Sequence, residues 1–122
     1  EFEHIFESIA KKNVEAYNAA DREAAAEMYD EQGVIVDKNN NKVFFGSEQI
    51  KEMIDGFIMM GKVEYKTPRK VFTDLGGNRF HVDVEFITTF VDAGHELKGS
   101  SQHLYEHKDG NWKCVYEIFE MY

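Results

Sequence analysis

The sequence predicts an α+β fold in which helices come first and a mainly antiparallel sheet follows. In the first half of the chain, apolar residues recur every three or four positions, which is typical of amphipathic helices. The second half consists almost entirely of β-branched and alternating stretches broken by short turns, which is typical of strands joined as hairpins. This order indicates helices that cover one face of a curved sheet.

The first twenty residues predict a long amphipathic helix. Its apolar stripe consists of Phe2, Ile5, Phe6, Ile9, Ala16, Tyr17 and Ala20. Asn13 falls on the same stripe, and a polar side chain on a buried face needs a hydrogen-bond partner. Asn13 is therefore either a satisfied amide of the helix face or a ligand contact. Tyr17 is expected in the core, with its hydroxyl at a pocket wall.

Two further helices and a hairpin are predicted before the long strands. Asp21 is the expected N-cap of a short alanine-rich helix that stops at Gly33. Val34–Asp37 and Val43–Phe45 flank the turn KNNN and predict a hairpin, because Asn tolerates the positive φ of tight turns. Ser47 is the expected N-cap of the third helix. The apolar residues of that helix are Ile50, Met53, Ile54, Phe57 and Ile58.

The remainder of the chain predicts strands. They cover Lys62–Thr73, Phe80–Phe90, the stretch SSQHLYEH and the stretch WKCVYEIFEMY. Within Phe80–Phe90, alternation places Val82, Val84 and Phe86 on one face, and we expect that face to point inward.

The strand SSQHLYEH presents a histidine as a candidate functional residue. Alternation puts Ser101, His103 and Tyr105 on one of its faces. If that face points inward, His103 is a buried titratable group beside the pocket. The alternative is a structural histidine that is hydrogen-bonded to a neighbour. Glu117, on the last strand, is expected at the pocket rim, with an inward-facing position as the alternative.

Length and charge exclude several partners. The 122 residues suit a single domain spanning 1–122. The 14 basic and 23 acidic residues give a net charge of −9, and no basic cluster exceeds the pairs Lys11-Lys12 and Arg69-Lys70. We therefore expect neither nucleic acid nor a membrane surface as a partner, because both need concentrated positive charge.

The only cysteine, Cys114, excludes an internal disulfide and a zinc site built from several thiolates. It alternates with Trp112 and Tyr116, and we expect it on the outer face of the sheet. Cysteine usage and the lack of an apolar stretch of about 20 residues favour a cytoplasmic protein. Because the sequence begins at Glu1 rather than Met, removal of an upstream targeting segment is an open alternative.

No motif predicts a cofactor or a metal. His103 and His107 lie four residues apart, about 13 Å along a strand, which is too far for one ion. His81 and Asp83 could share a metal only with a third ligand that the sequence does not show. No phosphate loop, dinucleotide fingerprint or nucleophile elbow is present.

Three stretches, taken in order, resemble the NTF2-like superfamily. They are AADREAAAEMYDEQGVIVD (Ala19–Asp37), FGSEQIKEMI (Phe45–Ile54) and LYEHKDGNWKCVYE (Leu104–Glu117). That superfamily includes ketosteroid isomerase, SnoaL-type polyketide cyclases, scytalone dehydratase and the association domain of calcium/calmodulin-dependent protein kinase. The resemblance implies a cone, in which a strongly curved sheet packs around three N-terminal helices, with one apolar pocket and dimerisation through the outer sheet face.

The resemblance gives Asp37 a possible catalytic role. Ketosteroid isomerase uses an Asp base with an oxyanion hole made of Tyr and a protonated Asp. Counted from Met28-Tyr29, that base falls on Asp37, while Asn13 and His103 replace the two oxyanion-hole residues. Steroid isomerisation itself is therefore not expected, since losing one such donor costs on the order of 10²–10³ in rate. In the alternative interpretation, Asp37 accepts hydrogen bonds from its turn.

Three functions fit these observations. The first is an isomerase-, dehydratase- or cyclase-like enzyme for a carbonyl-bearing ligand, with Asp37 as base and His103 as its catalytic partner. The second is a passive pocket for a small hydrophobic molecule. The third is an assembly module that uses the outer sheet face, with Ile87, Trp112, Tyr116 and Ile118 at the interface. The expected ligand contacts are Asn13, Tyr17, Val82, Val84, Phe86 and Tyr105.

Overall fold

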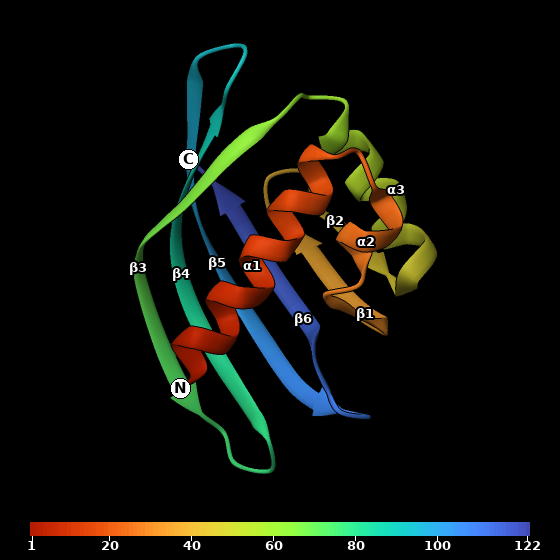
Figure 1. The fold of residues 1–122 in the computed structure, drawn as a ribbon, viewed down its shortest axis with the longest axis vertical. Coiled ribbons are helices and arrows are strands. Elements are labelled where there is room, and N and C mark those ends of the chain that lie inside the picture. Colours follow the sequence, from red (N-terminus) through yellow and green to blue (C-terminus); the bar gives the residue numbers. More distant parts are fainter.

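A computed structural model describes residues 1–122 as three helices held in the hollow of one six-stranded sheet (Figure 1). The helices are α1 (Phe2–Asn18), α2 (Arg22–Ala26) and α3 (Gly46–Ile58). The strands are β1 (Tyr29–Asp37), β2 (Lys42–Phe45), β3 (Val63–Asp74), β4 (Arg79–Phe90), β5 (His95–Lys108) and β6 (Asn111–Met121). The predicted α+β class is confirmed.

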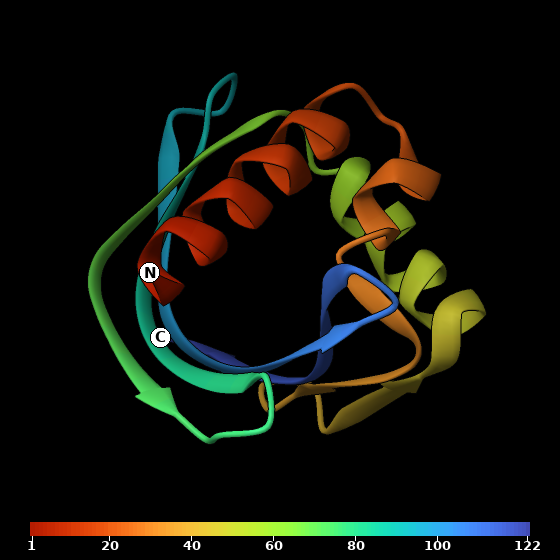
Figure 2. The same cartoon turned by 60° about the horizontal axis from the view of Figure 1, so that its bottom comes forward.

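The sheet is mainly antiparallel and strongly curved. Its strand order is β2-β1-β6-β5-β4-β3, and only β1 and β6 pair in parallel. Figure 2 shows the sheet curling around α1, while α2 and α3 lie beside β1 at the other side of the hollow. Because β1 and β6 are neighbours, residues from distant parts of the sequence meet on the inner face of the sheet.

The helix ends agree only partly with the sequence. Asp21 caps α2 as predicted, since its side chain accepts a hydrogen bond from the backbone of Ala24 at 3.1 Å. The predicted cap at Ser47 is wrong. The N-cap of α3 is Phe45, two residues earlier, and Gln49 Oε1 accepts the backbone N–H of Phe45 at 2.8 Å. None of the three helices combines the length and the apolar character that crossing a membrane would require.

A β-bulge in β6 changes which side chains point inward. The pairing with β5 shifts between Cys114 and Tyr116, so Val115 has no partner in the register. Cys114 and Glu117 consequently face the same side, although a regular strand would place them on opposite faces. The prediction that Cys114 lies on the outer face is wrong, because its side chain is fully buried. Trp112 likewise packs against the core rather than facing outward.

The core consists of two apolar clusters. The first lies under α1 and contains Phe6, Phe80, Val82, Val84, Phe86, Tyr105 and Cys114. The second joins α2 and α3 to the sheet and contains Ala25, Ala26, Ile35, Ile50, Ile54 and Phe119. Members of both clusters line the same cavity, so the site lies where the two clusters meet.

Candidate functional site

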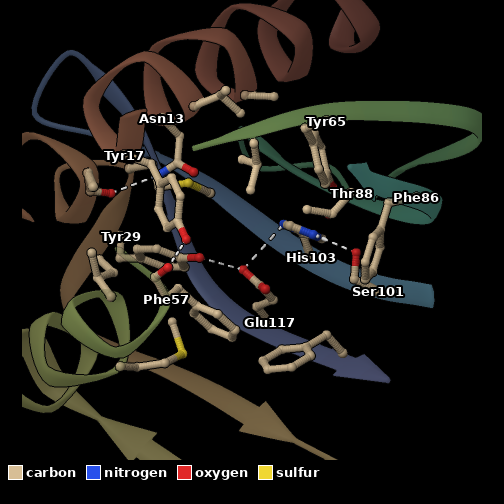
Figure 3. A pocket seen from close by; sticks show the side chains of 18 of the residues that line it. Asn13, Tyr17, Tyr29, Phe57, Tyr65, Phe86, Thr88, Ser101, His103 and Glu117 are labelled. Atoms are coloured by element: carbon tan, nitrogen blue, oxygen red, sulfur yellow. Dashed lines mark hydrogen bonds and ion pairs between the residues drawn. The ribbon is translucent and has the colours of Figure 1, made fainter. Parts of the chain in front are cut away.

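A cavity of about 210 Å³ opens on the inner face of the sheet, beneath α1 and beside α3 (Figure 3). Of its 23 lining residues, 18 are hydrophobic. Such a wall favours an apolar occupant, because apolar surface is more stable out of water. The cavity has the apolar character expected of the pocket.

The cavity gathers a majority of the predicted site residues. Those that line it are Asn13, Tyr17, Phe86, His103 and Tyr105. Val82 and Val84 are not among its lining residues. Both valines are buried on the inner face as predicted, but they pack within the first core cluster.

Asp37 does not line the cavity either. Its Oδ1 accepts the backbone N–H groups of Asn39 at 3.0 Å and Asn40 at 3.2 Å. Its Oδ2 accepts the side-chain amide of Asn40 at 2.9 Å. Asp37 ends β1, and its carboxylate turns toward donors that the KNNN turn would otherwise leave without partners. These contacts match the turn interpretation. They leave the carboxylate out of contact with the cavity, where a catalytic base would have to act.

We expect Asp37→Ala to lower the free energy of unfolding by about 1–3 kcal/mol, because the substitution removes a buried carboxylate that accepts three hydrogen bonds from the turn. Urea denaturation measures this loss. Asp37→Asn keeps one side-chain oxygen and should lose less. A wild-type unfolding free energy for Asp37→Ala would contradict the assigned turn role.

Four polar side chains from β1, β5 and β6 meet on the floor of the cavity (Figure 3). Tyr29 Oη donates a hydrogen bond to Glu117 Oε1 at 2.7 Å. His103 Nδ1 lies 3.8 Å from the same carboxyl oxygen, and His103 Nε2 lies 2.9 Å from Ser101 Oγ. The side chains converge because His103 and Glu117 are directly paired across β5 and β6.

A fifth polar side chain on this floor is Tyr105 of β5, whose hydroxyl lies 3.1 Å from His103 Nδ1. Burial lowers the pKa of His103, and the charge of Glu117 opposes this shift less strongly. Burial also raises the pKa of Tyr29, Tyr65 and Tyr105, and the charge of Glu117 raises the pKa of each further. At neutral pH the floor therefore carries protonated phenols and an uncharged imidazole around Glu117.

Asn13 and Tyr17 connect α1 to its neighbouring helices. Asn13 Nδ2 donates to the carbonyl of Ala25 at 2.8 Å, and Tyr17 Oη donates to the carbonyl of Phe57. Both side chains are thus satisfied structural contacts that also line the cavity. Their donors are committed to the protein, which limits what they can offer a ligand.

The sequence interpretation missed Tyr29, and it gave an inward-facing Glu117 only as the alternative to a rim position. Tyr29 was expected in the second helix, but that helix ends at Ala26 and Tyr29 begins β1. Glu117 was expected at the rim because the bulge cannot be read from strand alternation. Counting back by two from Phe119, an apolar residue near the end of the chain, would have placed Glu117 on the inner face.

The bulge also creates a group of possible metal ligands. One ligand atom each from His103, Cys114 and Glu117 lies within 4.8 Å of the others. A thiol, an imidazole and a carboxylate are a suitable set for a transition metal such as zinc. Here the Cys114 thiol donates to the carbonyl of Tyr116 at 3.4 Å, and burial raises its pKa well above the usual range. Metal binding would have to displace that proton.

Comparison with known proteins identifies the fold. No protein-family model matches the chain. No curated protein matches it in sequence. Solved structures do match it. A candidate calcium/calmodulin-dependent protein kinase II association domain from Xanthomonas campestris superposes with a TM-score of 0.85 at 17% identity, covering 96% of this chain and 85% of that one.

Two further structures support the same assignment. The association domain of the Caenorhabditis elegans kinase gives a TM-score of 0.76 at 17% identity, covering 96% of this chain and 93% of that one. An NTF2-like protein of unknown function from Shewanella oneidensis gives 0.74 at 16% identity, covering 98% and 99%. The chain therefore has the NTF2-like fold, and the resemblance found in the sequence is confirmed at the level of fold.

Proposed function

We propose that this chain, which has the NTF2-like fold, binds a small and mainly apolar molecule in its cavity. The character of the cavity wall carries the proposal, since 18 of the 23 lining residues are hydrophobic. Protein interiors are close-packed, and voids larger than a water molecule are few. A cavity of about 210 Å³ between two well-packed clusters is therefore an unusual feature that ligand binding explains.

A cavity-filling substitution tests the proposal. Val14 lines the cavity from α1, whereas the next residue, Glu15, is exposed on the same helix. We expect neutral aromatic probes such as indole and naphthalene to raise the Tm of the wild type and of Glu15→Trp, but not that of Val14→Trp. A ligand at a hundred times its Kd stabilises the folded state by about 2.7 kcal/mol. Equal shifts in all three proteins, or none in any, would contradict cavity binding.

A more specific proposal is that the protein catalyses a reaction of the bound molecule. The base would then not be Asp37, which the sequence resemblance suggested. Glu117 and His103 are 3.8 Å apart and reach the cavity, whereas the Asp37 carboxylate serves the hairpin. A proton transfer of the isomerase, dehydratase or cyclase type would therefore run through Glu117 and His103. Mass analysis of bound probes before and after incubation separates turnover from passive binding.

Self-association is a second candidate function, and the outer sheet face favours it. Side chains with large exposed fractions lie there on β2 and β6, the two strands that flank β1, among them Phe45 at 57%, Val43 at 61% and Tyr116 at 39%. Val34 pairs with both Phe45 and Tyr116, so the apolar surface is continuous. Two of the similar structures are association domains, one of them a candidate. Light scattering tests this proposal, and a monomer at micromolar concentration would contradict it.

A further inference from the structure

Building on the proposed cavity function, we infer that the preferred ligand is a lipophilic amine whose protonated nitrogen pairs with Glu117. The inference depends on three features of the cavity. They are an acidic group without a cationic partner, a wall without any lysine or arginine donor, and a set of aromatic rings.

Glu117 is the only acidic residue that lines the cavity, and no Lys or Arg lines it. Its side chain is only 12% exposed, and its nearest basic group is His103 at 3.8 Å. The imidazole makes no hydrogen bond to Glu117, because its Nδ1 lies 3.1 Å from the Tyr105 hydroxyl and its Nε2 lies 2.9 Å from Ser101 Oγ. A buried carboxylate is unfavourable unless it is paired, so a cationic ligand would stabilise this site.

The hydrogen bonds of the cavity wall also favour a cationic ligand. Tyr29 donates to Oε1 of Glu117, whereas no protein group donates to Oε2. The donors of Asn13 and Tyr17 are used by backbone carbonyls. The wall therefore offers a carboxylate oxygen as a strong acceptor, whereas its remaining hydroxyl donors, such as those of Tyr65 and Thr88, are neutral. That pattern is complementary to a ligand ammonium group rather than to a ligand carboxylate.

Aromatic rings complete the match to an organic cation. Tyr65 and Phe86 line the cavity and stack with ring centroids 5.8 Å apart. Phe6 lies opposite on α1, with its ring centroid 5.8 Å from the ring of His103. The faces of such rings attract cations, and their area favours an apolar body.

The competing cation is a metal ion held by His103, Cys114 and Glu117. Cys114 is fully buried, does not line the cavity, and uses its thiol proton in a hydrogen bond to a backbone carbonyl. An ammonium ion can reach Glu117 from the cavity without displacing that proton. The organic cation therefore requires less change in the site than the metal does.

Three probes with one skeleton test the inference: 4-phenylbutylamine, 4-phenylbutanol and 4-phenylbutyrate. We expect calorimetry at pH 7 to show that the wild type binds the amine roughly ten- to a hundredfold more tightly than the alcohol, and the acid most weakly. Glu117→Gln keeps an oxygen for Tyr29 but removes the charge, so it should bind the amine and the alcohol equally. The control Glu120→Gln changes a half-exposed carboxylate on the same strand and should retain the amine preference.

The possible outcomes separate the two proposals. Equal binding of amine and alcohol by the wild type would overturn the inference and leave the apolar cavity function intact. A failure of all three probes and of the neutral aromatic probes would overturn the cavity function itself. Binding of Co²⁺ with thiolate-to-cobalt absorption that disappears in Cys114→Ser would overturn the inference in favour of a metal. An amine preference that Glu117→Gln abolishes would support it.

Discussion

Gly99→Ala is expected to destabilise the protein by about 3 kcal/mol, because the added methyl group has no space. A Cβ at this position would overlap the backbone carbonyl oxygen of Glu120 and lie 2.6 Å from Cζ of Phe86. Gly99 pairs with Phe86 on one side and with Met121 on the other, so it lies in the middle of the sheet. Urea denaturation measures the loss.

Gly56→Ala is a matched control for the same chemical change. Gly56 lies within α3, and a Cβ there would meet nothing within 4 Å. Because Ala favours a helix over Gly by roughly 0.5–1 kcal/mol, this variant should be as stable as the wild type or more so. An unchanged denaturation midpoint for Gly99→Ala would show that Phe86 or β6 can move aside, and would contradict the steric explanation.

The position of Gly99 matters for the cavity as well as for stability. Glycine inside a strand commonly marks a close approach of another group. Here the ring of Phe86 lies directly against Gly99, and the same ring lines the cavity. We expect a side chain at position 99 to displace Phe86 and therefore to reduce apolar probe binding in any variant that still folds.

The fold could be predicted from the sequence because most of its elements have one apolar and one polar face. The spacing in α1 and the alternation in Phe80–Phe90 each specify which side is buried, and the structure agrees with both. The second helix was predicted too long because alanine propensity is a local property. Pairing of Tyr29 with Cys114, which lies far along the chain, decides where β1 begins.

On the strands, the site could be predicted only where alternation continued without interruption, whereas the helical spacing of α1 correctly placed Asn13 and Tyr17 at the cavity. The inner positions His103 and Tyr105 follow from the regular pattern of β5. The bulge at Val115 reverses the pattern within β6, so Cys114 and Glu117 were placed on the wrong side or at the rim. Asp37 shows that a position that matches a family motif does not by itself predict the contacts of the side chain. Its place in the chain resembles a catalytic position, but its hydrogen bonds are made with the adjacent turn.

Phe6→Ala should give a second large loss of stability, of about 3–5 kcal/mol. Phe6 is 2% exposed, is the one fully buried residue of α1, and lines the cavity. Its ring lies edge-on to the rings of Phe72, His103 and Tyr105, with centroids 6.0, 5.8 and 6.2 Å away. Phe45→Ala, which removes a ring that is 57% exposed, should change stability by no more than about 0.5 kcal/mol.

The Phe6→Ala variant also tests whether the cavity takes apolar molecules. Removing the ring extends an existing apolar space, and an engineered cavity of this kind can bind benzene. We therefore expect benzene to raise the Tm of Phe6→Ala more than that of the wild type, and to recover part of the lost stability. If stability falls as expected but benzene has no larger effect than on the wild type, the space has collapsed. In that case Phe6 not only forms part of the cavity wall but also keeps the cavity open.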